Sequence, residues 1–398
     1  MVTRFAVDTS TLLRYPQVVN EYKCVILACV LRELEKHKIS RDEDLRYQVR
    51  EATRVLCTSD VEFDFRDYCF DLEPTYDPNY TDNQILQACK DAGYGLITDD
   101  LLLKLKAKGF GVEVVELKEP EFFTGYKRIT MTDNELADFY ENKQDNKYEL
   151  VLNEYIVIYN KQGEALDAYK WTIKGFVKTK YKTIASKYVG KVEPLNVEQE
   201  LYMDMLQDKT TKVKAISGSY GSGKNYISLA FFLDQIDKGN YERIVWIRNN
   251  VEASGSKPVG HLPGNLDDKL GVYAEIIGDF VGEESEMQKL ISDGKIKLAH
   301  SGFIRGRDIR NSIIYIEEAQ NVPNKKMMGL LVSRCSANSM VFLNGDIEQT
   351  DGGISKSANG LYSAIQAFKG HPNFAHVHLT KTERSETAET AEMANLLR

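Results

Sequence analysis

The sequence predicts an α/β protein with more than one domain. Short apolar segments typical of buried strands alternate with amphipathic segments typical of helices, and a glycine-rich segment follows one of the strands. The chain also has 398 residues, which is long for a single domain. Because strands that alternate with helices form parallel sheets, we expect parallel-sheet domains over residues 1–120 and 195–398. A small β-rich connector is expected over residues 121–194.

The glycine-rich segment runs from Lys212 to Leu229 and reads KVKAISGSYGSGKNYISL. An alternating strand pattern precedes the glycines, and apolar residues suited to a helix follow Lys224. Glycines let backbone N–H groups turn toward a phosphate, and a helix N-terminus adds positive charge. The alternative is an ordinary glycine turn with a surface lysine. We expect an ATP-binding phosphate loop formed by Gly218, Ser219, Tyr220, Gly221, Ser222, Gly223, Lys224 and Asn225.

Position 225 departs from the usual form of this loop, in which a Ser or Thr hydroxyl ligates Mg²⁺. The carbonyl oxygen of Asn225 is also a hard ligand, but it lies one bond further from the backbone. The sequence therefore predicts nucleotide binding more firmly than fast hydrolysis.

Composition restricts the possible partners and the compartment. The net charge of −8 excludes a simple polycation, so any contact with nucleic acid must come from a local patch. Six scattered cysteines without a CxxC pair indicate buried free thiols in a reducing cytoplasm, and no zinc signature is present. The first residues lack the apolar run of a signal peptide, and no stretch approaches the ~20 apolar residues of a membrane span. We expect a cytoplasmic protein with no membrane partner.

Acidic residues recur at strand ends and helix starts in the first 120 residues. In a parallel sheet the strand ends share one edge, where carboxylates repel unless a divalent cation neutralises them. Mg²⁺ or Mn²⁺ held there supports phosphodiester hydrolysis. For any one acid, a role as a helix cap or a solvated loop residue is the better interpretation. The set consists of Asp8, Glu33, Asp82, Asp99 and Asp100.

Four short motifs around these acids resemble those of PIN-domain ribonucleases. VDTSTLL, VLRELEKHK, TDNQILQA and LITDDLLLKLKA follow one another in the family's order across roughly residues 4–110. The resemblance implies that Asp8, Glu33, Asp82 and Asp100 are catalytic and hold the metal, with Asp99 beside them.

The connector combines lysines with aromatic residues. Between Lys161 and Lys191 there are eight lysines and two acids, interleaved with tyrosines, a tryptophan and a phenylalanine. Lysines can follow phosphates while aromatic faces stack on bases, so Lys178, Lys180 and Lys182 are candidates for RNA binding. An alternative, compatible with the first, is a small β module with solvated lysines and aromatic residues in its core.

The last 200 residues contain further candidates for ATP chemistry. Glu317 and Glu318 follow the apolar run of NSIIYIEEAQ; in a phosphate-loop fold the first acid holds Mg²⁺ and the second polarises the attacking water. Gln349 follows the last strand pattern, SMVFLNGDIEQ, and is placed to sense the γ-phosphate. Gln199 precedes the phosphate loop and is a candidate for recognising the edge of the adenine base.

This region resembles the PhoH family of P-loop ATPases from residue 195 to about 385. GSYGSGKN, FIRGRDIRNSIIYIEEAQN and VFLNGDIEQTDGG carry the resemblance. The family has Thr or Ser at position 225, Asp at 317 and often Thr at 344, and this chain has Asn225, Glu317 and Asn344. A RecA-like ATPase fold is implied, in hexameric rings where an arginine from the next subunit completes the site. Candidates are Arg305, Arg307, Arg334 and Arg384.

The order of the two resemblances is that of PIN–PhoH fusion proteins. It implies an ATP-dependent RNA helicase coupled to a metal-dependent endoribonuclease, with ATP and Mg²⁺ or Mn²⁺ as cofactors. Two alternatives stay open: an RNA clamp that ATP switches but that hydrolyses ATP weakly, and a motor and nuclease that act on single-stranded DNA.

Overall fold

The chain folds into two compact units, Met1–Glu121 and Phe122–Arg398. The computed structural model describes residues 4–41, 43–72, 76–117, 122–248, 284–300, 304, 308–322, 324–336, 338–349 and 359–383. Three of the arginine candidates, Arg305, Arg307 and Arg384, lie outside these residues. Among the helices that are described, none combines the length and apolar character needed to cross a membrane.

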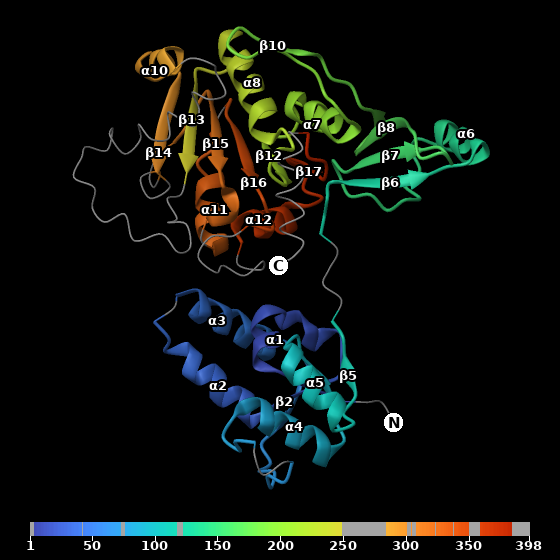
Figure 1. Ribbon diagram of the computed structural model, residues 1–398, viewed down its shortest axis with the longest axis vertical. Coiled ribbons are helices and arrows are strands. Elements are labelled where there is room, and N and C mark those ends of the chain that lie inside the picture. Colours follow the sequence, from blue (N-terminus) through green and yellow to red (C-terminus); the bar gives the residue numbers. More distant parts are fainter. Residues whose placement is uncertain are drawn as a thin grey trace. The chain divides into compact units, whose positions relative to one another are not determined.

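The first unit is a five-stranded parallel sheet with helices around it (Figure 1). The strand order is β3-β2-β1-β4-β5, and every neighbouring pair is parallel. The central strands are short and fully apolar because helices cover them, as expected for a buried parallel sheet. The strands are β1 (Phe5–Val7), β2 (Cys24–Leu27), β3 (Glu62–Asp64), β4 (Gly95–Ile97) and β5 (Val114–Val115). The helices are α1 (Thr9–Arg14), η1 (Pro16–Asn20), α2 (Ala28–Lys38), α3 (Glu43–Thr58), α4 (Thr81–Ala92) and α5 (Leu101–Gly109).

All six cysteines are free, but the expectation that they are buried holds only in part. Cys24, Cys29 and Cys89 are buried in the core of the first unit, whereas Cys57 and Cys69 are exposed. Cys57 lies on the solvent-facing side of the amphipathic helix α3. Apolar neighbours in the sequence do not determine which side of a helix a residue occupies, so they did not predict this exposure.

The second unit contains a six-stranded parallel sheet in the order β14-β13-β15-β16-β12-β17. Helices α7, α8 and α10 pack on one face, and α11 and α12 on the other. The strands are β12 (Val213–Gly218), β13 (Arg243–Arg248), β14 (Ile296–His300), β15 (Ser312–Glu317), β16 (Met340–Gly345) and β17 (Phe374–Leu379). The helices are α7 (Val197–Gln207), α8 (Lys224–Asp237), α10 (Glu284–Ser292), η3 (Ala319–Asn321), α11 (Asn324–Val332) and α12 (Gly360–Phe368).

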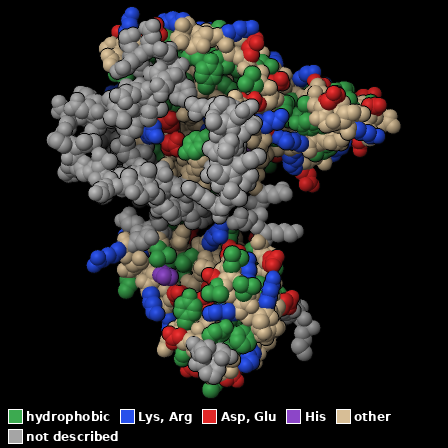
Figure 2. Space-filling view, viewed as in Figure 1, with side chains coloured by type: hydrophobic (Ala, Val, Ile, Leu, Met, Phe, Trp, Pro, Cys, Tyr) green, Lys and Arg blue, Asp and Glu red, His purple; other side chains and the backbone are tan. Residues whose placement is uncertain are grey.

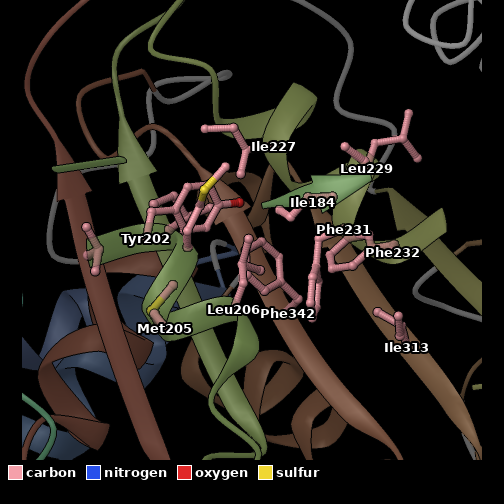
Figure 3. Close-up of a cluster of buried hydrophobic side chains, with 14 of the residues drawn as sticks. Ile184, Tyr202, Met205, Leu206, Ile227, Leu229, Phe231, Phe232, Ile313 and Phe342 are labelled. Atoms are coloured by element: carbon pink, nitrogen blue, oxygen red, sulfur yellow. The ribbon is translucent and has the colours of Figure 1, made fainter. Parts of the chain in front are cut away.

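The core on the α7 and α8 side is aromatic. Tyr202 from α7, Phe231 and Phe232 from α8 and Phe342 from β16 lie close together (Figure 3). Ile184 from the connector enters the same cluster, so part of the connector belongs to this core. Burial of such side chains contributes roughly 1.5–3 kcal/mol each.

The rest of the connector is a mixed four-stranded sheet of β6 (Tyr126–Thr130), β7 (Tyr155–Tyr159), β8 (Ala165–Thr172) and β9 (Gly175–Lys178). Helix α6 (Asp133–Glu141) begins with a capping box formed by Thr132 and Glu135. A hairpin of β10 (Ile184–Ser186) and β11 (Gly190–Val192) follows and packs on α8. Tyr169 and Phe176 are buried against Phe139, so these two aromatic residues form core rather than a base-stacking surface.

The predicted fold class is therefore confirmed: α/β, with a parallel N-terminal sheet, small connector sheets and a parallel six-stranded sheet. On the face shown in Figure 2, acidic and basic side chains are interspersed over both units. Any contact with nucleic acid must still come from a local feature.

Candidate functional sites

The predicted nuclease acids lie at one edge of the N-terminal sheet. Asp8 directly follows β1 and precedes α1, while Asp100 follows β4 and caps α5 by accepting a hydrogen bond from Leu103 N (2.7 Å). Because β1 and β4 are parallel neighbours, both acids leave the sheet at the same edge. Asp82 belongs to the first turn of α4, and Glu33 to α2.

Three of these carboxylates act on one another electrostatically. The pKa of Asp82 is raised to about 6, chiefly by burial and further by the charges of Asp8 and Asp100. Burial also raises the pKa of Asp8, although hydrogen bonds from Ser10 (2.5 Å) and Thr98 (3.1 Å) favour its charged form. Like charges held together in this way are the environment that a cation stabilises.

Glu33 and Asp99 are held differently. Glu33 Oε2 accepts a hydrogen bond from Thr9 Oγ1 (2.6 Å), so it is linked to the α1 start that carries Asp8. The carboxylate of Asp99 instead lies 3.6 Å from Arg14, and its backbone N–H donates to Thr11 Oγ1 (2.8 Å). Of the two consecutive aspartates, it is Asp100 that contributes to the raised pKa of Asp82.

The donor set fits a divalent cation in its chemistry, because carboxylate oxygens are the ligands that Mg²⁺ and Mn²⁺ prefer. Within the residues that the structure describes, however, no three His, Cys, Asp or Glu side chains converge closely enough to hold an ion together. The roles of the acids as metal ligands stay a prediction.

Several further residues of this site were not predicted from the sequence. Thr9, Ser10 and Thr98 donate to the acids, and Lys106 lowers the pKa of Asp82 while donating to Asn83 Oδ1 (3.0 Å). The hydroxyls stand next to the acids in DTS and ITDD, and that proximity was the available signal. Nothing in the sequence points to Lys106, which reaches the site only through the packing of α5 on α4.

The predicted phosphate loop lies between β12 and α8, and its glycines have the backbone angles that the interpretation requires. Gly218, Gly221 and Gly223 have φ of +147°, +75° and +89°. A Cβ on Gly218 would lie 2.3 Å from Leu379 O, so the loop also needs this glycine for its close packing on β17. Lys224 is the first residue of α8.

Lys224 is directed back over the loop. Its Nζ donates to the carbonyls of Gly218 and Ser219, both at 2.6 Å. Burial lowers its pKa to about 8, and the charges of Asp346 and Glu318 partly oppose this. The lysine and the acids that follow β15 and β16 therefore form one electrostatically coupled cluster at the strand ends.

Glu318 adopts a left-handed conformation, with φ +50° and ψ +45°. Such a conformation is costly for a residue other than glycine and is frequent at active sites. Gln320, which the sequence analysis missed, bridges the cluster: its Nε2 donates to Glu318 Oε2 (2.5 Å), and its Oε1 accepts from Asp346 N (3.1 Å).

The three positions that depart from the resembled family contact one another. Asn225 Nδ2 donates to Glu317 Oε1 (3.1 Å), and Asn225 Oδ1 accepts from Asn344 Nδ2 (2.5 Å). Asn344 Nδ2 also donates to Tyr315 Oη (2.5 Å). We call Asn225, Glu317 and Asn344 the amide–carboxylate network.

Glu317 is deeply buried within this network. Burial raises its pKa, while Arg248 at 3.6 Å and a hydrogen bond from Trp246 Nε1 (3.1 Å) favour the charged form. Asn344 Oδ1 has no hydrogen-bond partner among the described residues. Because both polar groups of the Asn225 side chain are engaged within the protein, Asn225 and Glu317 do not fit the role of a preformed pair of Mg²⁺ ligands.

The remaining nucleotide-site candidates lie around the loop. Gln199 is buried, with Nε2 donating to Ser222 O (3.1 Å) and Oε1 accepting from Leu195 N (2.8 Å), so its side chain holds the loop in place. Tyr220 is 64% exposed at the loop tip. Gln349 is half-buried three residues beyond Asp346. The adenine-reading and γ-phosphate-sensing roles stay predictions.

Arg334 lies far along the strands from the phosphate loop. It follows α11, where its backbone carbonyl accepts from Ile309 N just before β15 begins. The phosphate loop lies at the opposite edge, where β12 ends, so Arg334 could complete a nucleotide site only in another subunit. That role stays a prediction.

The three candidate RNA-binding lysines differ in their surroundings. Lys178 forms an ion pair with Asp167. Lys180 and Lys182 are exposed, while their backbone N–H groups donate to Asp204 Oδ1 and Gln207 Oε1 on α7, both at 2.9 Å. The stretch that carries them is therefore fastened to α7.

Comparison with known proteins agrees with this arrangement. Residues 5–118 match the family described as PIN domain, and residues 191–395, slightly more than half of the chain, match the family described as PhoH-like protein. The chain is 25% identical to "Protein PhoH2" of Thermobispora bispora, over 96% of this chain and 94% of the relative. It is 26% identical to "Protein PhoH2" of Bacillus subtilis, over 97% and 98%. A third relative, "Protein PhoH2" of Mycolicibacterium smegmatis, is 30% identical over 48% of this chain and 45% of its own length. The protein thus belongs to the PhoH-like family, with a PIN domain preceding the PhoH-like region.

Proposed function

We propose that this protein is an ATP-dependent RNA helicase coupled to a metal-dependent endoribonuclease. The observation that best supports the proposal is that one chain carries two groups of mutually coupled charged side chains, each at the strand-end edge of a parallel sheet. Asp8, Asp82 and Asp100 form the first group, and Lys224, Glu318 and Asp346 the second. We assign residues 1–120 to the nuclease, 121–194 to the connector and 195–398 to the ATPase.

In the ATPase half, the phosphate loop binds the β- and γ-phosphates through its backbone N–H groups and the N-terminus of α8. Lys224 exchanges the carbonyls of Gly218 and Ser219 for phosphate oxygens. Glu318, held by Gln320, accepts a proton from the water that attacks the γ-phosphate.

In the nuclease half, Asp8, Asp82 and Asp100 would hold the cation, with Glu33 linked through Thr9. A bound Mg²⁺ or Mn²⁺ supplies hydroxide at neutral pH and stabilises the leaving oxygen. The hydroxyls of Ser10 and Thr98 keep Asp8 oriented and charged, so that it is ready to bind the cation.

A second candidate function is an RNA clamp that ATP switches but that hydrolyses ATP weakly. The amide–carboxylate network favours it, because Asn225 and Glu317 are engaged with each other. Single-stranded DNA in place of RNA is the third candidate. For each of these candidate functions we propose that the protein forms a homo-oligomeric, hexameric ring. An arginine of the adjacent subunit completes the nucleotide site of each chain.

The experiment incubates the full chain with a labelled RNA hairpin bearing a single-stranded tail, ATP and either Mg²⁺ or Mn²⁺. We expect strand separation that needs ATP and cleavage that needs the cation. In Asp8→Asn, cleavage should be lost while strand separation and ATP binding persist. In Glu318→Gln, strand separation should be lost while cleavage of the tail persists.

The two variants serve as controls for each other, since each removes one activity from the same folded chain. RNA cleavage at the parent rate by Asp8→Asn would refute the nuclease site. ATP binding without hydrolysis or strand separation in the parent would favour the clamp, and preference for a DNA hairpin of the same sequence would favour the third candidate.

A further inference from the structure

The second unit has a lysine-rich cavity at the edge of its sheet opposite the phosphate loop. The cavity has a volume of about 450 Å³ and lies where β12 and β16 begin, beside the C-terminal end of α7. Its lining includes five lysines, Lys182, Lys209, Lys212, Lys214 and Lys238. We call it the lysine pocket.

The charge of the lysine pocket is opposite to that of the chain as a whole. Five lysines and two aspartates, Asp208 and Asp234, line it, and burial lowers the pKa of Lys214 to about 7. The local charge at pH 7 is therefore between +2 and +3, whereas the whole chain carries −8. Both aspartates are already paired: Asp234 with Lys238, and Asp208 with Lys170, each at 2.7 Å. Within the described part of the chain, Lys182, Lys209 and Lys212 have no acidic partner.

The floor of the lysine pocket is polar and incompletely satisfied. Thr211 is fully buried, and its hydroxyl has no hydrogen-bond partner among the described residues. Lys214 is also buried, but its Nζ donates to the carbonyls of Met205 (2.6 Å), Leu206 (2.7 Å) and Asp208 (2.6 Å). Lys214 therefore anchors the end of α7, and the Thr211 hydroxyl lies beneath the cavity surface, where a ligand does not reach it.

The rim of the lysine pocket continues the basic stretch of the connector. Gln207 on α7 donates to Lys182 O (2.7 Å) and accepts from Lys182 N (2.9 Å), which fixes Lys182 beside the lysines that follow α7. Lys182 and Lys209 are exposed and Lys212 is half-buried. Flexible ammonium groups around a rim can contact successive phosphates of a strand, whereas an arginine fork binds one phosphate in a fixed bidentate geometry.

We propose that the lysine pocket holds one nucleotide of the RNA strand. The rim lysines, Lys182, Lys209 and Lys212, contact neighbouring phosphates, and the nucleotide between these phosphates enters the cavity. The volume is within the range of pockets that enclose a ligand of this size. This inference rests on the proposed function, because it assumes that the chain binds RNA.

The test measures binding of a fluorescein-labelled uridine oligonucleotide at several salt concentrations, in an Asp8→Asn background so that RNA is not cut. Each phosphate contact with a single strand contributes about 0.7 to the slope of log K against log salt. Lys209→Ala combined with Lys212→Ala should therefore lower the slope by about 1.4, twice that value. The matched control is Lys161→Ala with Lys174→Ala, which removes the same charge from two exposed turns of the connector sheet and should leave the slope unchanged.

Equal slopes for the pocket and control variants, with both folded by tryptophan fluorescence, would overturn the proposal. So would binding of uridine monophosphate that is lost in the pocket variant while RNA binding persists, because the cavity would then be a small-ligand site. A parent chain that binds no RNA under any of these conditions would instead refute the proposed function.

Discussion

The amide–carboxylate network makes a sharp prediction for Asn225→Thr. The side chain of Asn225 accepts a hydrogen bond from Asn344 and donates one to Glu317, and both partners are buried, with 1% and 4% of their surface exposed. Threonine is shorter and has no amide, so both hydrogen bonds are lost. Asn344 keeps its bond to Tyr315, and Glu317 keeps its bond from Trp246.

The expected loss of stability follows from these contacts. A neutral intramolecular hydrogen bond contributes roughly 1 kcal/mol and one to a charged group roughly 1.5–3 kcal/mol. Asn225→Thr should therefore lower the free energy of unfolding of the second unit by about 2.5–4 kcal/mol. This is a large share of the 5–15 kcal/mol that is typical of a folded domain.

Urea unfolding followed by tryptophan fluorescence measures this loss directly. Both tryptophans of the chain, Trp171 and Trp246, lie in the second unit, so the signal reports that unit alone. Asn240→Thr is the matched control, because it makes the same substitution at an exposed asparagine and should change stability by less than about 0.5 kcal/mol. Equal unfolding midpoints for the two variants would refute the reasoning.

The same network predicts how ATP hydrolysis responds. Asn225→Thr alone leaves Glu317 and Asn344 without their partner, so we expect a higher kcat only when Glu317→Asp and Asn344→Thr are added. Steady-state ATPase rates of the single and triple variants decide this. If no variant exceeds the parent rate, Asn225 does not limit hydrolysis.

Three further predictions concern the two sites and the assembly. The pKa of Asp82 is about 6 in the folded protein against 3.8 for a free side chain. Protonation of Asp82 therefore stabilises the folded protein, and this stabilisation is fully present below pH 3.8 and is lost as the pH rises through 6. Asp82→Asn should therefore stabilise the first unit at pH 7.5 but not at pH 4, by calorimetry; an equal effect at both pH values would contradict the raised pKa. Lys224→Ala should abolish ATP binding while Glu318→Gln retains it, as measured by titration calorimetry, and normal binding by Lys224→Ala would disprove the role of the loop. Light scattering with ATP and Mg²⁺ should detect a hexamer, and a monomer under these conditions would exclude the ring.

The local sequence determined much of the architecture and of the two sites. Apolar runs followed by amphipathic segments predicted most strands and helices of both parallel sheets, because burial on both faces requires continuous apolar strands. The prediction that SMVFLNGDIEQ is the last strand is wrong, because β17 follows it and pairs with β12. The glycines predicted a loop whose backbone N–H groups turn toward a phosphate, and their positive φ angles, which only glycine adopts without strain, agree with it. Asp8 and Asp100 were placed at one edge because Asp8 directly follows one strand of a parallel sheet and Asp100 comes three residues after the end of the neighbouring strand.

Other features depend on contacts that no local pattern encodes. The sequence presented Asp100 as a metal ligand only through a family resemblance, with Asp99 beside it, whereas the fold pairs Asp99 with Arg14 and directs the charge of Asp100 toward Asp82. The lysine pocket likewise joins the connector to segments that follow α7 and α8.

The amide–carboxylate network shows the difference most clearly. The sequence by itself identified Asn225, Glu317 and Asn344 as departures from the family pattern. Only the tertiary structure brought them together, because β16 lies between β12 and β15 in the sheet. The ends of these parallel strands therefore meet at one edge, where a change in one side chain alters the hydrogen-bond partners of the other two.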